Sequence, residues 1–160
     1  MTERARKETA QQKSDPRDGV LHIIPADRRF IPPKEQQQQA VRRLEELVRG
    51  TPVCSAWDHE YVQVIGLFRV HRQKLVCPAC GDEHTLSYDD VFYFSEALGV
   101  QPPTEIDLTM PCCDARVVLA DVELGPNVGF ARFGLEIAPR TTKLSAERIV
   151  ALEKVLGCPL

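Results

Sequence analysis

The sequence predicts an α+β fold in which an antiparallel sheet carries amphipathic helices on one face and a zinc-ribbon-like knuckle. Short β-favouring runs alternate with segments of helical periodicity, and two cysteine clusters lie about thirty residues apart. At 160 residues the chain has room for one domain with a substantial apolar core. We therefore expect a single domain over residues 19–160, containing a zinc-ribbon-like segment at 74–116.

Residues 1–18 contain few apolar side chains and predict a flexible polar tail, because they have little surface to bury that would offset the entropy of ordering. Basic side chains in this segment could contact an acidic partner, but four acidic residues dilute them. A solvated tail is the favoured interpretation.

The first half of the predicted domain contains a strand, a helix and a second strand. Val20–Ile24 is a short β-favouring run closed by a proline. Helical periodicity begins at Pro33 and ends at Gly50, with a single apolar stripe between them. Tyr61–Ile65 has the composition of a strand, and we expect it to extend through Phe68 and Val70.

The second half contains two further helices and several strands. Ser87 and Asp90 have the spacing of a capping box for a helix that ends at Gly99. Residues 104–110, 117–124 and 130–137 alternate in polarity, and the turn residues at 125–127 predict a β-hairpin between the last two runs. Ser145 is placed to cap a final helix that ends at Gly157.

Composition indicates the environment. The chain lacks an apolar run long enough to cross a bilayer, and its first thirty or so residues do not form an apolar export segment. Six cysteines are too few for a disulfide scaffold of this length, so they favour a reducing compartment. We expect a soluble cytoplasmic protein without a membrane partner, and the sequence gives no indication of its oligomeric state.

Charge argues against nucleic-acid binding. The net charge is −3, with eleven Lys/Arg against eight Asp/Glu in residues 1–50 and nine against fifteen in residues 51–160. Phosphate contacts need a concentrated basic face, which the acidic globular part does not supply. Binding to DNA or RNA remains an alternative only because zinc ribbons often have that function.

The cysteines predict a metal site. Cys77 and Cys80 enclose Pro78-Ala79 and precede a glycine, which is typical of a tight turn that presents two sulfurs to one ion. Cys112 and Cys113 follow Pro111 and could complete a tetrahedral Zn²⁺ site with no open position for a substrate.

The second cluster departs from the usual Cys-x-x-Cys spacing. Adjacent cysteines in an extended strand would point to opposite faces, so both can bind one ion only if the backbone turns sharply beside them. Pro111 and Asp114 give modest support for such a turn. The fallback set replaces one of the adjacent cysteines with His84. A third interpretation is an empty site of buried thiols.

Other polar groups give weaker signals. Cys77 and Cys80 could form a thiol–disulfide pair, although the acidic neighbours oppose thiolate formation. The run at residues 58–60, with His71, is the remaining cluster that could suggest hydrolysis or a second metal, but its spacing matches no helical zinc motif. Three further residues are interpreted as core or edge side chains: Cys54, Cys158 and His22.

Two resemblances accompany these residues. Cys77 to Gly81 resembles a zinc-ribbon half-site. Pro111-Cys112-Cys113, together with residues 129–133 and 152–160, is similar to uncharacterised bacterial proteins with a paired-cysteine zinc-ribbon-like insert. The likeness implies a fold and a metal but no activity. We therefore expect a zinc-stabilised domain that binds another protein without catalysis, the alternatives being a thiol–disulfide or metal-dependent enzyme and a nucleic-acid-binding zinc ribbon.

Overall fold

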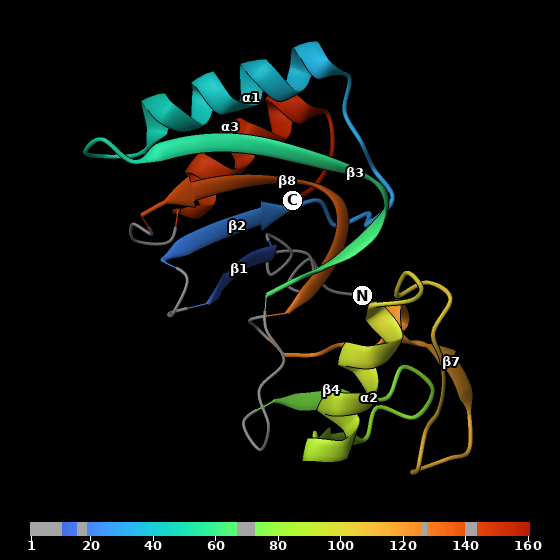
Figure 1. The fold of residues 1–160 in the computed structure, drawn as a ribbon. Coiled ribbons are helices and arrows are strands. Elements are labelled where there is room, and N and C mark those ends of the chain that lie inside the picture. The colour runs from blue at the N-terminus through green and yellow to red at the C-terminus, as the bar shows by residue number, and fades with distance from the viewer. Residues whose placement is uncertain (1–10, 16–18, 67–72, 126–127, 140–143) are drawn as a thin grey trace, which may run out of the picture. The chain divides into compact units, whose positions relative to one another are not determined.

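The computed structural model describes residues 11–15, 19–66, 73–125, 128–139 and 144–160 (Figure 1). The chain divides into two compact units, of which unit 1 comprises Met1–Glu60 with Ala131–Leu160 and unit 2 comprises Tyr61–Phe130. That residues 19–160 fold as one domain stays a prediction.

Unit 1 is built on a sheet in the strand order β1-β2-β8-β3. The bounds of these strands are β1 Gln11–Asp15, β2 Val20–Ile24, β3 Val53–Ile65 and β8 Gly129–Ala138. β2 pairs antiparallel with β1 and with β8, where Leu21 lies opposite Ile137. One face of β8 is fully buried, with Phe133, Leu135 and Ile137 on it, whereas Arg132 and Glu136 on the other face are partly exposed.

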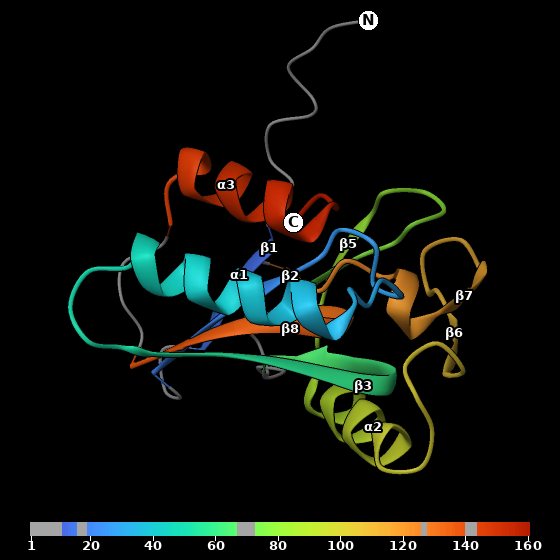
Figure 2. The same ribbon diagram turned by 90° about the horizontal axis from the view of Figure 1, so that it is seen from above.

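Two helices cover one face of this sheet. α1 (Lys34–Leu47) and α3 (Ala146–Leu156) lie on the same side of it in both views (Figures 1 and 2). Their apolar stripes supply Leu44 and Leu152 to a core that also contains Leu21 and Phe133, all of them fully buried. The predicted α+β class, with an antiparallel sheet and amphipathic helices, is confirmed.

Strand β1 lies within the segment for which composition predicts a flexible tail. Its five residues pair in register with β2, from Gln11 opposite Ile24 to Asp15 opposite Val20. Backbone pairing of this kind does not require apolar side chains, which explains why composition gave no signal for the strand. The rest of the predicted tail lies outside the described residues.

Unit 2 contains two short antiparallel hairpins and a helix. β4 (Lys74–Val76) pairs with β5 (Glu83–Thr85), and β6 (Asp107–Thr109) pairs with β7 (Arg116–Val118). α2 (Tyr88–Leu98) connects them, and its Ser87–Asp90 capping box is present as predicted. Residues from both hairpins and from α2 share one buried cluster, which includes Leu75, Phe94, Ile106 and Met110.

Two expectations about strands need correction. The predicted β-hairpin between 117–124 and 130–137 is wrong, because β7 pairs with β6 whereas β8 lies between β2 and β3. A turn of 3₁₀-helix at Leu119–Asp121 ends the extended run after β7. The strand expected from Tyr61 begins earlier, at Val53, and its predicted extension through Val70 lies outside the described residues.

Candidate metal centre

The first cysteine loop is the connection between β4 and β5, residues 77–82. The N–H of Cys77 donates to the carbonyl of Asp82, and the N–H of Gly81 donates to the carbonyl of Cys77, both at 2.9 Å. Gly81 has φ +82°, a left-handed conformation that glycine adopts at little cost. These contacts close a tight loop that presents Cys77 and Cys80 on one side.

The second cysteine loop, residues 110–115 between β6 and β7, repeats the same frame. The N–H of Met110 donates to the carbonyl of Ala115, and the N–H of Asp114 donates to the carbonyl of Met110, both at 2.9 Å. Asp114 has φ +55° and takes the place of the left-handed glycine, a conformation in which aspartate is enriched. The sharp turn that two adjacent cysteines require is therefore present.

Matched hydrogen bonds align the two loops residue by residue. Pro78 corresponds to Pro111, and Cys80 corresponds to Cys113. Met110 stands where the first loop has Cys77, and Cys112 stands where it has Ala79. The second loop is thus a knuckle of the same shape whose first sulfur has moved two positions along the chain. Aligning Cys77–Asp82 with Met110–Ala115 by their prolines would have revealed this from sequence.

The four predicted cysteines meet at one point. The sulfur atoms of Cys77, Cys80, Cys112 and Cys113 all lie within 4.8 Å of one another. The sulfur–sulfur distance is 3.7 Å for Cys77–Cys113, 3.3 Å for Cys80–Cys112 and 3.8 Å for Cys112–Cys113. A Zn–S bond of about 2.3 Å in a tetrahedron gives S···S edges of about 3.8 Å. The donor set therefore fits a tetrahedral metal ion in both chemistry and spacing.

Close packing of the thiols shifts the pKa values of Cys77 and Cys112 in opposite directions. Burial of Cys77 opposes ionisation, but the backbone amides of Cys80 and Ala79 and the neighbouring thiols lower its pKa to about 7. Desolvation, followed by hydrogen bonding with the other three thiols, raises the pKa of Cys112. Thiols bind metal ions as thiolates, so a bound cation would favour ionisation of this cluster.

His84, the fallback ligand, is not part of this group. It lies on β5 opposite Leu75, and the metal-ligating atoms that come together are the four sulfurs. Its Nε2 is buried and lacks a hydrogen-bond partner among the residues that the structure describes. The geometry thus favours the set of four cysteines over the histidine variant.

The cluster at residues 58–60 has a structural explanation. Asp58 accepts hydrogen bonds from Lys34 Nζ at 2.5 Å and from Gln37 Nε2 at 2.6 Å, and these bonds lower the pKa of its carboxyl group. The carboxylate therefore fastens the start of α1 to β3. His71, the other residue of the weak hydrolytic hypothesis, lies outside the described residues.

The remaining residues singled out from sequence belong to the core of unit 1 or its sheet. Cys54 and Cys158 are buried, and desolvation raises the pKa of both thiols, to about 11 for Cys158. His22 Nδ1 lies 3.1 Å from Glu136 Oε1 on the neighbouring strand. Cys54 and Cys158 are therefore packing residues, and His22 lies on an interior strand of the sheet.

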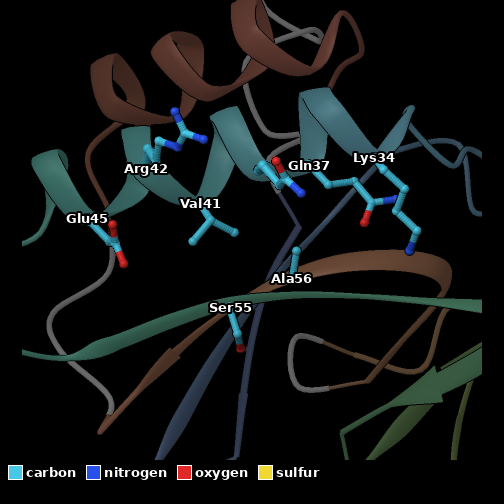
Figure 3. A pocket seen from close by; sticks show the side chains of 8 residues that line it. Lys34, Gln37, Val41, Arg42, Glu45, Ser55 and Ala56 are labelled. Atoms are coloured by element: carbon cyan, nitrogen blue, oxygen red, sulfur yellow. The ribbon is translucent and has the colours of Figure 1, made fainter.

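Unit 1 also has a cavity of about 490 Å³ between α1 and the first half of β3. Figure 3 shows Ala56 pointing toward α1 and Ser55 pointing away from it. Lys34 and Gln37 line this cavity, but both already bind Asp58, and Gln37 also donates to the carbonyl of Pro32. Its polar groups serve the fold, so this cavity is a weaker candidate than the cysteine cluster.

Fold and site together define an α+β protein with a cluster of four cysteines that could hold a metal ion. Among the described residues, every helix is too short or too polar to span a bilayer. Comparison with protein-family models, with curated proteins and with solved structures found no match to this chain. The suspected zinc-ribbon likeness therefore depends on the cysteine cluster alone.

Proposed function

We propose that Cys77, Cys80, Cys112 and Cys113 bind one Zn²⁺ that stabilises unit 2, and that unit 2 binds another protein without catalysing a reaction. The observation that supports metal binding is that four sulfur atoms, from two loops of the same shape, lie at tetrahedral spacing. Four thiolates fill the coordination shell of zinc and leave no position for a substrate, which favours a structural role.

Zinc is the ion that this donor set suits best. It is borderline soft, accepts thiolates readily and imposes no geometry other than the tetrahedron that the spacing offers. Residues 61–130 make up a unit of modest size, for which a structural metal is a common supplement to a small apolar core. The metal would fasten the ends of two hairpins, β4–β5 and β6–β7, to each other.

The surface of α2 supports a protein partner. Tyr88, Phe92 and Tyr93 are 68%, 54% and 51% exposed, and the first two lie four residues apart on one side of the helix. Exposed aromatic side chains of this kind are enriched at protein interfaces. Residues 61–130 contain four Lys/Arg against ten Asp/Glu, and this excess of negative charge disfavours nucleic acid.

Metal analysis of the purified full-length chain tests the site. We expect about one zinc per chain, and replacement by Co²⁺ should give the visible absorption of a tetrahedral tetrathiolate site. Cys112→Ala should lower the affinity for zinc, and Met110→Cys added to it should restore binding, because the second loop then has the sulfur positions of the first. Cys54→Ala, which removes a thiol from the core of unit 1, is the matched control.

Two outcomes would contradict the metal proposal. The first is zinc content that Cys112→Ala leaves unchanged. The second is metal-free protein in which Cys77 and Cys80 form a reversible disulfide, which would favour the redox enzyme.

The protein-binding part is tested separately. Partners captured by the zinc-loaded chain should be lost from the variant Tyr88→Ser/Phe92→Ser and kept by Val150→Ser, which removes an exposed apolar residue from α3. Direct binding of each candidate, measured with purified proteins, must show the same ranking. Equal binding by both variants would exclude α2 as the contact surface.

A further inference from the structure

A cavity of about 410 Å³ lies within unit 2 beside the cysteine loops. Its walls come from β5, α2 and β6, and it reaches Met110 and Pro111 at the start of the second cysteine loop. Leu86, Phe94 and Met110 supply an apolar floor, and each of them is at most 4% exposed. The cavity thus has an apolar base close to the proposed metal centre.

Two strand edges whose outward backbone groups have no partner strand among residues 73–125 line the cavity. In the β4–β5 hairpin, the N–H of Leu86 donates to the carbonyl of Gln73, and the N–H of Cys77 donates to the carbonyl of Asp82. Hydrogen-bonded and non-hydrogen-bonded pairs alternate along an antiparallel hairpin, so the backbone groups of Thr85 face away from β4. The same reasoning turns the backbone groups of Asp107 and Thr109 away from β7. These three residues line the cavity.

The negative charge of the cavity lining favours a cationic ligand. The lining contains the carboxylates of Asp90 and Asp107 and no lysine or arginine. Asp90 is occupied by the capping box with Ser87, whereas Asp107 has no hydrogen bond or ion pair among the described residues. Tyr93, half exposed on α2, adds an aromatic wall that can contact the stem of a long cationic side chain.

We propose that this groove, residues 75, 84–86, 90, 93–94 and 107–111, binds an extended peptide segment of another protein that carries a lysine or arginine. The peptide backbone would pair with the free edge at Asp107 and Thr109, which is strand addition. Its apolar side chains would pack on the floor, and its cation would reach Asp107. This inference rests on the proposed function and names the class of partner, because zinc holds the loop that ends the groove at Met110.

Selection from a displayed library of random peptides, about seven residues long, against the zinc-loaded chain tests the groove. Enriched peptides should alternate apolar residues with lysine or arginine, and synthetic copies should show binding that weakens with salt. Asp107→Lys should weaken the binding of an enriched peptide at least about tenfold by charge repulsion. Glu96→Lys, on α2 outside the groove, is the matched charge control.

A proline pair tests strand addition. The backbone amide that Thr109→Pro removes points away from β7, so the β6–β7 ladder remains while an enriched peptide loses about fivefold in affinity. Arg116→Pro removes the equivalent outward amide of β7, on the far edge of the same hairpin, and should leave peptide affinity within about twofold of the parent chain. Circular dichroism and zinc content of every variant confirm that it folds.

Several results would overturn the groove proposal while leaving the metal proposal intact. They are a zinc-loaded chain that enriches no peptide, enrichment of acidic peptides, or equal losses from each variant and its control. A second copy of this chain seated in the groove, seen as a dimer that Asp107→Lys dissociates, would also overturn it. Zinc content below about half an ion per chain would instead mark failure of the proposed function.

Discussion

Gly134 makes room for the only tryptophan of the chain, and filling that room should destabilise unit 1. A Cβ built on Gly134 would lie 2.4 Å from Cζ2 and 2.8 Å from Cε2 of Trp57, on the neighbouring strand β3. Carbon atoms pack at about 3.5–4.0 Å, so in Gly134→Ala the rigid indole must move by about 1 Å. Overpacking of this kind costs about 1–3 kcal/mol.

Replacing glycine also restricts the unfolded chain, which returns about 0.5–1 kcal/mol. Taking the middle of each range, the net loss in the free energy of unfolding is about 1 kcal/mol. Urea denaturation followed by far-UV circular dichroism measures it, and the fluorescence of Trp57 should change in the folded variant because the indole has moved. A lower midpoint with an unchanged slope is the expected result.

A double-mutant cycle tests the stated cause. In the background Trp57→Leu, the alanine at position 134 should be neutral or slightly stabilising, giving a coupling energy of at least about 1 kcal/mol. If Gly134→Ala leaves the midpoint unchanged, or if its cost is the same without the indole, then contact with Trp57 is not the reason for glycine at this position.

Three further results are expected. When free zinc is first held about a thousandfold above Kd, its removal with a chelator should lower the free energy of unfolding by about 4 kcal/mol. Amide hydrogen exchange should then accelerate most in the two cysteine loops. Unchanged exchange would contradict the structural role. Iodoacetamide should label the four clustered thiols after chelation. It should spare Cys54 and Cys158 until the chain unfolds, because burial raises the pKa of both thiols. Mass spectrometry of the peptides measures the labelling of each cysteine. Asp58→Asn should cost about 1 kcal/mol at neutral pH and less in acid, because hydrogen bonds from Lys34 and Gln37 lower the pKa of Asp58. Its contribution is therefore present above the unfolded pKa and is lost as pH falls through the folded value. A cost that does not change with pH would contradict this.

Helices were predictable because their signals are local. Pro33 and Gly157 mark helix ends through their own backbone preferences, and the apolar stripe of each helix repeats within a few turns. Strand pairing was less predictable, since a partner is chosen by distant residues. The alternation in 130–137 correctly indicated a strand with one buried face but did not reveal that β8 lies between β2 and β3.

The metal site was also predictable only in part. Four cysteines could be named from spacing and the chemistry of zinc, and the structure brings those four together. The arrangement of the second loop could not be read from spacing, because it depends on the left-handed conformation of Asp114 and on the bond from its N–H to Met110. The groove was also missed, since its walls are strands too short to give a periodic signal.

The displaced sulfur of the second knuckle has a consequence for how metal loops are recognised. Because the loop keeps its shape with methionine at its first position, the backbone frame and the chelating residues are separable: the frame fixes a small volume, and a thiol from either of two sites can reach it. Searches for the frame, a proline followed three residues later by a left-handed residue, would find such centres where counting the interval between cysteines overlooks them.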